Sequence, residues 1–309
     1  MIATVYRSTG SWYDITDEAG QPWKARIKGV FKIDGLTSTN PIAVGDTVDF
    51  EIENETDHIA TIYGIHDRHN YISRQSPGHR KQQHIVASNL DQAILVATIS
   101  HPRTSAGFID RFLVATEAYH VPALLVINKM DTWKEKEKLQ FAYWKEMYEA
   151  VGYTVMPISV QTGEGLDAVK AMLQNKTSLF SGHSGVGKSS LLNALVPGFS
   201  LRTKEVSGWS GKGMHTTTFA EMFDLPFGGK VVDTPGIREF GIVDIEREEL
   251  SHYFPEMRQI IHDCQFNNCQ HMNEPGCAVK KAVEEGRISP DRLGSYWNIL
   301  ESMPQNNWE

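Results

Sequence analysis

The sequence predicts a multidomain α/β protein in three parts: an N-terminal β-barrel of the OB type, a doubly wound α/β domain and a small helical C-terminal domain. Short alternating strands fill residues 1–72, strands alternate with helices over residues 73–245, and all three cysteines fall in the helical residues 246–309. At 309 residues the chain is longer than one hydrophobic core usually supports, so we expect separate domains with these boundaries.

The barrel is predicted from period-two alternation of apolar and polar residues, as in half-buried strands. The expected strands cover residues 3–6, 23–27, 46–52 and 59–63. Acidic side chains outnumber basic ones in residues 1–72, whereas an RNA-binding barrel usually offers a basic groove with stacking aromatics. One face could still provide such a groove, from Trp23, Lys24, Arg26, Lys28, Phe31 and Lys32. We expect the polar, turn-rich residues 74–81 to form a linker.

The central domain is predicted from strands and helices that alternate along the chain. Residues 92–98 form a continuous apolar run, which favours a parallel strand buried on both faces. We expect further strands near residues 123–127, 153–158, 178–180, 219–223 and 230–232, and helices over residues 108–119, 134–151, 166–174 and 189–195.

A phosphate-binding loop lies between a predicted strand and a predicted helix, with the pattern Gly-x-x-x-x-Gly-Lys-Ser. Glycines let the backbone N–H groups point at phosphates, and the N-terminus of the following helix adds positive potential. Lys188 is expected to reach the β- and γ-phosphates, and Ser189 to bind Mg²⁺. The expected contacts are Gly182, His183, Ser184, Gly185, Val186, Gly187, Lys188, Ser189 and Ser190.

A second motif, Asp233-Thr234-Pro235-Gly236, follows an apolar strand, where open α/β sheets bind ligands. We expect Asp233 to lie on the Mg²⁺ side, and the backbone N–H of Gly236 to sense the γ-phosphate. A third motif, Asn128-Lys129-Met130-Asp131, also ends an apolar strand. Its carboxylate can accept paired hydrogen bonds from guanine that adenine does not offer, so the sequence predicts GTP rather than ATP. Ser159 ends another strand and could contact the base.

The order of these motifs is itself informative, since the base-reading motif precedes the phosphate loop. That order predicts a circularly permuted P-loop GTPase domain. Residues 207–218 are polar and glycine-rich, as a mobile switch loop should be. We favour Thr217 over Thr216 as its Mg²⁺ ligand. Ile237 stands where many GTPases carry a water-orienting glutamine, so His215 is the best candidate for positioning the attacking water; the alternative is a solvated loop histidine.

The cysteines are too few and too close together for a disulfide framework. Cys264, Cys269, His271 and Cys277 offer three thiolates and an imidazole, a set that suits a structural zinc ion. His262 is a rival for His271, which the spacing favours. The net charge of −8 argues against coating nucleic acid by charge alone. The sequence shows neither a secretory signal nor an apolar run of the roughly 20 residues that span a bilayer, so we expect a cytoplasmic protein without membrane contact.

With these motifs in this order over nearly its full length, the chain closely resembles the ribosome-small-subunit-dependent GTPase A family. The resemblance implies a GTPase stimulated by the 30S ribosomal subunit, a role in late small-subunit maturation, and contact of both flanking domains with 16S rRNA. It also supports His215, because the family uses a switch-loop histidine. We expect a monomer whose partners are GTP, GDP and the 30S subunit. Two alternatives are a binding module that GTP occupancy gates without a need for hydrolysis, and a GTPase that acts on another RNA or on translation.

Overall fold

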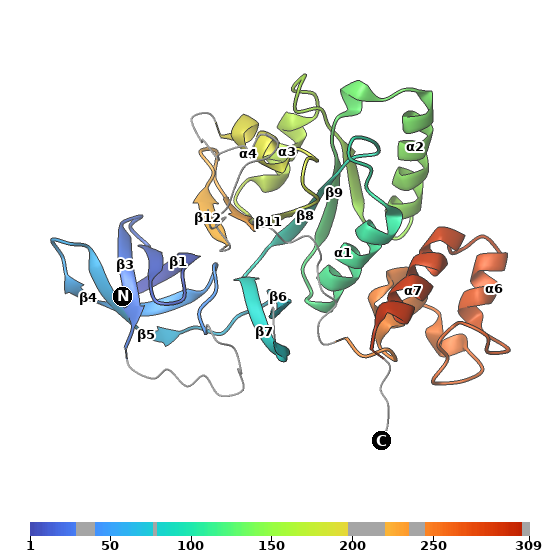
Figure 1. Cartoon of the computed structure of the whole chain (residues 1–309), viewed down its shortest axis with the longest axis horizontal. Helices are drawn as coiled ribbons and strands as arrows, with labels where there is room; N and C mark the ends of the chain where they lie inside the picture. The colour runs from blue at the N-terminus through green and yellow to red at the C-terminus, as the bar shows by residue number, and fades with distance from the viewer. Residues whose placement is uncertain (29–40, 77–78, 197–219, 235–244, 305–309) are drawn as a thin grey trace, which may run out of the picture.

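The protein is described by a computed structural model over residues 1–28, 41–76, 79–196, 220–234 and 245–304. Eleven of its strands form one sheet in the order β10-β9-β8-β11-β13-β12-β1-β2-β3-β5-β4 (Figure 1). These strands are β1 (Ile2–Ser8), β2 (Tyr13–Asp17), β3 (Pro22–Ile27), β4 (Thr47–Asn54), β5 (Ile59–Ile65), β8 (Gln92–Ala97), β9 (Ala123–Ile127), β10 (Thr154–Pro157), β11 (Thr177–Ser181), β12 (Glu221–Asp224) and β13 (Lys230–Asp233).

Five of the strands close the expected N-terminal barrel. β1 pairs antiparallel with both β2 and β4, and β3 pairs parallel with β5, so the ring β1-β2-β3-β5-β4 returns to β1. Alternate residues such as Val5, Ile15 and Phe50 fill its core. β2 was absent from the expected strands. The same β1 pairs with β12 through Arg7 and Glu221, which joins the barrel to the central sheet.

The described part of the face proposed for RNA stacking differs from the expectation, whereas Phe31 and Lys32 lie outside the described residues. Trp23 is only 6% exposed, and its indole N–H donates to Asp17 (3.0 Å). The reason is the two-residue period of the strand: Trp23 and Ala25 point inward, while Lys24 and Arg26 point outward. Arg26 in turn is paired with Glu53 (2.9 Å). The buried Trp23 therefore cannot stack on a base, and the outward charge of Arg26 is compensated by an acid.

The expected linker at residues 74–81 falls mostly within two strands, β6 (Tyr71–Ser76) and β7 (His79–Ser88). They pair antiparallel with each other. A polar sequence with a Pro-Gly pair is equally typical of a linker and of a hairpin. The decisive factor is the pairing of two segments, which composition does not encode.

The central domain is the predicted doubly wound α/β unit. β10, β9, β8, β11 and β13 run parallel, β12 is antiparallel, and every residue of β8 is buried. Residues from α1 (Ala106–Ala118) and α2 (Glu135–Glu149) pack on one face, and residues from α3 (Leu166–Leu173) and α4 (Lys188–Leu195) on the other. β11, which precedes the phosphate loop, lies between β8, earlier in the chain, and β13, later in the chain. The permuted order therefore builds a sheet with the phosphate loop near its centre.

The C-terminal residues form the expected small helical unit. Its elements are η2 (Leu250–Tyr253), α5 (Pro255–Arg258), η3 (Ile261–Asp263), α6 (Ala278–Glu284) and α7 (Pro290–Ser302). Figure 1 shows α7 beside α1 and α6 beyond it, at the right of the view, with the barrel at the left. Val114 of α1 belongs to the hydrophobic core of this unit. Among the described helices, none has the length and apolar character that crossing a membrane requires.

Candidate nucleotide site and metal centre

The phosphate loop connects β11 to α4, as its sequence predicts. Its first glycine, Gly182, has a φ of +141°, and a Cβ there would come within 2.1 Å of the carbonyl oxygen of Val96. Only glycine fits this position, because any side chain would collide with the backbone of β8. The N-cap of α4 is Gly187, whose residue type provides no capping side chain, so the first N–H groups of the helix remain available to an anion.

Lys188 and Asp233 bring opposite charges to the loop. The ammonium of Lys188 donates to the carbonyl oxygens of Gly182 and of His183, the latter at 3.0 Å. Burial lowers the pKa of Lys188, an effect that Asp233 opposes. Burial likewise raises the pKa of Asp233, at the end of β13, against the effect of Lys188. Both charges are therefore held in a partly desolvated place, where electrostatic interactions with a phosphate or a cation are strong.

Asn128 ties the base-reading motif to the phosphate loop. Its side-chain N–H donates to the carbonyl oxygen of Val186 (2.9 Å), and its amide oxygen accepts from the backbone N–H of Val160 (3.2 Å). Gly187 has a φ of +98°, and a Cβ there would lie 2.4 Å from the Asn128 side-chain nitrogen, so its backbone conformation and this hydrogen-bonded side chain both favour glycine. One side chain thus fixes the spacing of three loops that come from distant parts of the chain.

The rest of the motif is held by its own hydrogen bonds. Lys129, in the left-handed region at φ +68°, donates through Nζ to the carbonyl oxygens of Gly185 (2.8 Å) and His101 (2.5 Å). The hydroxyl of Ser159 donates to Asp131 (2.6 Å), whose side chain is exposed. The Asp131 carboxylate is therefore oriented by the protein and open to a ligand.

The structure brings together most of the residues that the sequence nominated. Met130 follows the same strand, and its backbone N–H donates to the carbonyl of Ile158 (3.0 Å). Ser189 and Ser190 lie in the first turn of α4. Gly236, His215 and Thr217, with its alternative Thr216, lie outside the described residues.

Two contacts at this site have no motif in the sequence. The imidazole of His183 stacks on Phe108 of α1, with ring centroids 3.6 Å apart and planes 29° apart. The carbonyl of His101, in the loop between β8 and α1, accepts from Lys129. Only the sheet order, which places β8 beside β11, brings this loop to the phosphate loop.

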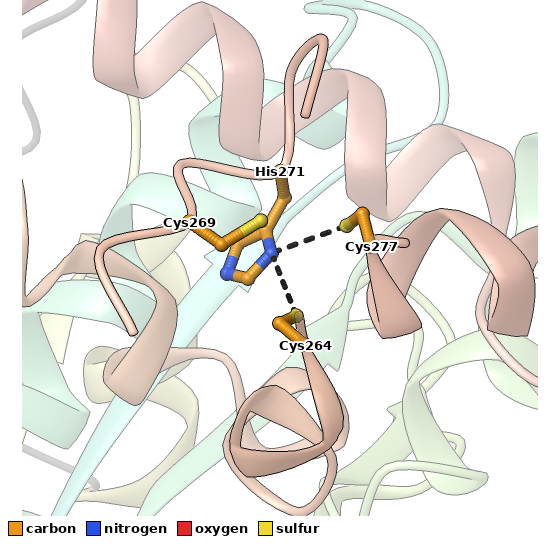
Figure 2. Close-up of side chains that lie close together, drawn as sticks. All are labelled: Cys264, Cys269, His271 and Cys277. Atoms are coloured by element: carbon orange, nitrogen blue, oxygen red, sulfur yellow. Dashed lines mark hydrogen bonds between the residues drawn. The ribbon is translucent and has the colours of Figure 1, made fainter. Parts of the chain in front are cut away.

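The four nominated metal ligands also converge (Figure 2). Their ligand atoms all lie within 4.8 Å of one another. Nδ1 of His271 lies 3.7 Å from Sγ of Cys264 and 3.4 Å from Sγ of Cys277. The rival His262 is paired with Asp263 at the surface. The structure therefore places His271, rather than His262, in the cluster.

Side chains of α7 hold the backbone around this cluster by hydrogen bonds. Trp297 donates through its indole N–H to the carbonyl of His271, and Tyr296 through its hydroxyl to that of Gln270, both at 3.0 Å. Burial raises the pKa of Cys269 to about 12, so the surroundings alone disfavour its thiolate. A divalent cation is the partner that would stabilise three thiolates here. The donor set and its spacing fit a metal ion.

Comparison with known proteins agrees with this architecture. The RsgA N-terminal domain model matches residues 3–60, and the RsgA GTPase model matches residues 65–243. The chain is 49% identical over 302 residues to the small ribosomal subunit biogenesis GTPase RsgA of Flavobacterium psychrophilum, covering 97% of this chain and 93% of that protein. It is 48% identical over 308 residues to the protein of the same name from Bacteroides fragilis, covering 100% and 99%.

Solved structures show the same likeness. YjeQ from Thermotoga maritima is 35% identical, with a TM-score of 0.79 and 97% of each chain covered. YloQ, described as a circularly permuted GTPase, is 28% identical, with a TM-score of 0.75 over 98% of this chain and 96% of that one. Permuted strand order, converging nucleotide loops and full-length similarity together show that this chain is a GTPase that belongs to the RsgA GTPase family.

Proposed function

We propose that this chain binds GTP where its phosphate loop and base-reading motif meet, and hydrolyses it to GDP and phosphate during maturation of the small ribosomal subunit. The main observation in support of this nucleotide site is the pair of hydrogen bonds that the Asn128 side chain makes with Val186 (2.9 Å) and Val160 (3.2 Å). They support a single pocket in which Asp131 reads guanine at one end and Lys188 meets the phosphates at the other.

The residues around the phosphates would act by holding and neutralising charge. Lys188 would exchange its bonds with loop carbonyls for bonds with β- and γ-phosphate oxygens, which are stronger acceptors because they are charged. Ser189 and Asp233, together with Thr217 from outside the described residues, would supply the oxygen ligands that Mg²⁺ prefers. Bound Mg²⁺ would neutralise charge that develops on the β- and γ-phosphates.

Two further residues outside the described ranges, His215 and Gly236, complete the proposal. We assign His215 to orienting the water that attacks the γ-phosphate, since Ile237 cannot do so. The backbone N–H of Gly236 would sense the γ-phosphate. Slow intrinsic turnover and faster turnover on the 30S subunit are then expected, because the partner would position His215 for catalysis.

We further propose that the metal is zinc. A tetrahedral zinc site has Zn–S distances of about 2.3 Å and Zn–N distances of about 2.0 Å, which puts nitrogen and sulfur about 3.5 Å apart. The Nδ1–Sγ distances of 3.7 and 3.4 Å around His271 bracket that value. With four protein ligands there is no open position, so the ion would be structural.

The partner is inferred from the relatives, which are named as small ribosomal subunit biogenesis GTPases. We propose that this chain acts as a cytoplasmic monomer on the 30S subunit and contacts 16S rRNA from its flanking units. The proposed division is residues 1–72, 73–245 and 246–309. Because Arg26 of β3 and Lys28 just beyond it are paired with acids, and Trp23 is buried, the barrel would meet RNA through another face.

The test is GTP turnover with and without purified 30S subunits, for the native chain and for His215→Ala. We expect clear stimulation of the native chain, and a loss of stimulated turnover on the order of 10²-fold in the variant with GTP and 30S binding retained. His262→Ala is the matched control, because His262 lies at the surface beside the metal centre.

Each other result would remove one part of the proposal. Unchanged turnover in His215→Ala would remove the catalytic assignment. GTP-dependent 30S binding without stimulated turnover would favour a gated binding module. Co-sedimentation with 50S rather than 30S subunits would reject the small-subunit role.

A further inference from the structure

Helix α1 touches the phosphate loop at its first turn. Phe108 stacks on the imidazole of His183 with ring centroids 3.6 Å apart. His183 is the residue whose carbonyl oxygen accepts from the ammonium of Lys188 (3.0 Å). The stack therefore joins α1 to the part of the loop that Lys188 holds.

The next turn of α1 carries a buried charge that belongs to another unit. Asp110 is fully buried and accepts from the guanidinium of Arg292 in α7 (2.6 Å). Arg292 is 1% exposed and also donates to Glu256 of α5, at 2.7 and 3.1 Å. Its guanidinium lies over the ring of Phe254, 4.6 Å from the centroid. A buried ion cluster of this geometry resists rearrangement, because separating its members leaves a charge without a partner.

The remaining turns of α1 continue the same contact. Val114 lies within the C-terminal hydrophobic core, Arg111 donates to Ser302 of α7 (2.8 Å), and Glu117 pairs with Arg258 (3.1 Å). One helix of 13 residues therefore touches the phosphate loop with its first turn and the metal-binding unit with all the others.

We propose that α1 transmits phosphate-loop occupancy to the C-terminal metal-binding unit, with Phe108 and His183 as the positioning contact at one end and Asp110 and Arg292 at the other. This rests on the proposed nucleotide site. A phosphate that draws Lys188 away releases the carbonyl of His183, and the stacked ring carries that change to α1. Because buried ion pairs fix α1 to α5 and α7, a change in the position of α1 also changes the position of the C-terminal unit. Coupling of this kind is reciprocal: seating of that unit changes nucleotide affinity by the same factor.

The test measures hydrogen exchange of α7 in the full-length, metal-loaded protein, alone, with GDP and with a non-hydrolysable GTP analogue. In the native chain we expect nucleotide to change α7 protection by about fivefold or more, the lower end of measured coupling. Phe108→Leu keeps apolar packing but removes the stack. It should still bind nucleotide, with an affinity changed by no more than the coupling factor of about fivefold, while α7 loses the response.

Tyr71→Leu is the matched control, because it removes an aromatic contact with Tyr119 (5.3 Å) at the other end of α1. It should keep the α7 response. If the native chain binds nucleotide and α7 protection does not change, the coupling is wrong while the site stands. If the native chain binds no nucleotide, both the site and the coupling are wrong.

A second measurement does not depend on Phe108→Leu folding. Asp110→Asn keeps an oxygen for Arg292 but removes the charge that fixes α1 to the C-terminal unit. By reciprocity we expect its affinity for the nucleotide that changes α7 protection to shift by the same factor of about fivefold. A nucleotide affinity equal to that of the native chain would overturn the proposal.

Discussion

Replacement of Arg292 by Met should destabilise the C-terminal unit more than any surface substitution nearby. Arg292 is 1% exposed, Asp110 is fully buried, and the two are joined at 2.6 Å. Removing the cation leaves the carboxylates of Asp110 and Glu256 without their cationic partner, and breaking a buried ion pair in this way costs about 3–5 kcal/mol. That is a large share of the 5–15 kcal/mol by which domains are typically stable.

The pH dependence of this loss has a defined sign. Burial already raises the pKa of Asp110, against the effect of Arg292, so the pKa should rise further in the variant. A carboxyl whose pKa is raised by folding destabilises the folded state once it ionises. The deficit of Arg292→Met should therefore be largest at high pH and shrink as pH falls towards about 3.9, the ordinary value for Asp.

The assay is the local unfolding free energy of α7 from amide exchange at pH 8 and pH 5, with Arg258→Met as the matched control. Arg258 pairs with Glu117 at 3.1 Å, but its side chain is 51% exposed, so its loss should cost less than about 1 kcal/mol. Equal losses in the two variants, or a deficit for Arg292→Met that grows at pH 5, would refute the reasoning.

Three further predictions concern the two sites. Asp131→Asn should lower GTP affinity about tenfold to a hundredfold and favour xanthosine triphosphate, since one charged hydrogen bond is worth about 1.5–3 kcal/mol. A competition assay between the two nucleotides tests this, and an unchanged preference for GTP would exclude Asp131 from base reading. Cys269→Ser should lower the amount of bound metal and the thermal stability of residues 246–309, while GTP binding is retained. Metal analysis and calorimetry test this prediction, and a loss of GTP binding would contradict it. Burial first, and Lys188 second, lower the pKa of His183, so the stability it contributes is present above about pH 6.5 and lost below. His183→Gln should therefore show a smaller drop in Tm between pH 8 and pH 5.5 than the native chain, and a larger drop would contradict the assignment.

Much of the fold could be predicted because its signals are local. The apolar run of β8 and the glycines of the phosphate loop each reflect a requirement that a short segment meets by itself. The burial of Trp23 and the hairpin at residues 71–88 could not be predicted with the same security, because both depend on which segments pair. The same tryptophan can face a binding groove or the core, and the sequence near it does not tell the two apart.

The candidate sites divide in the same way. Cys264, Cys269, His271 and Cys277 lie close together in the sequence, so their spacing was enough to nominate them. Arg292 has no such pattern: it is one arginine on a helix, and only packing against α1 makes it a buried partner of Asp110. Likewise nothing in the sequence pairs His183 with Phe108, whose ring lies on another element.

By itself, then, the sequence determined the order of the motifs, and it predicted the guanine- and phosphate-binding residues of the central domain and the four residues that could hold a metal ion. These follow from residue types at fixed short spacing, where chain connectivity keeps the groups together. Tertiary structure decided how those pieces are joined: β1 pairs with β12 to make one sheet, Asn128 bridges three loops, and α1 lies between the phosphate loop and the C-terminal unit. These contacts join residues far apart in the chain, and they form only because burial of apolar faces and pairing of strand edges select one packing from many.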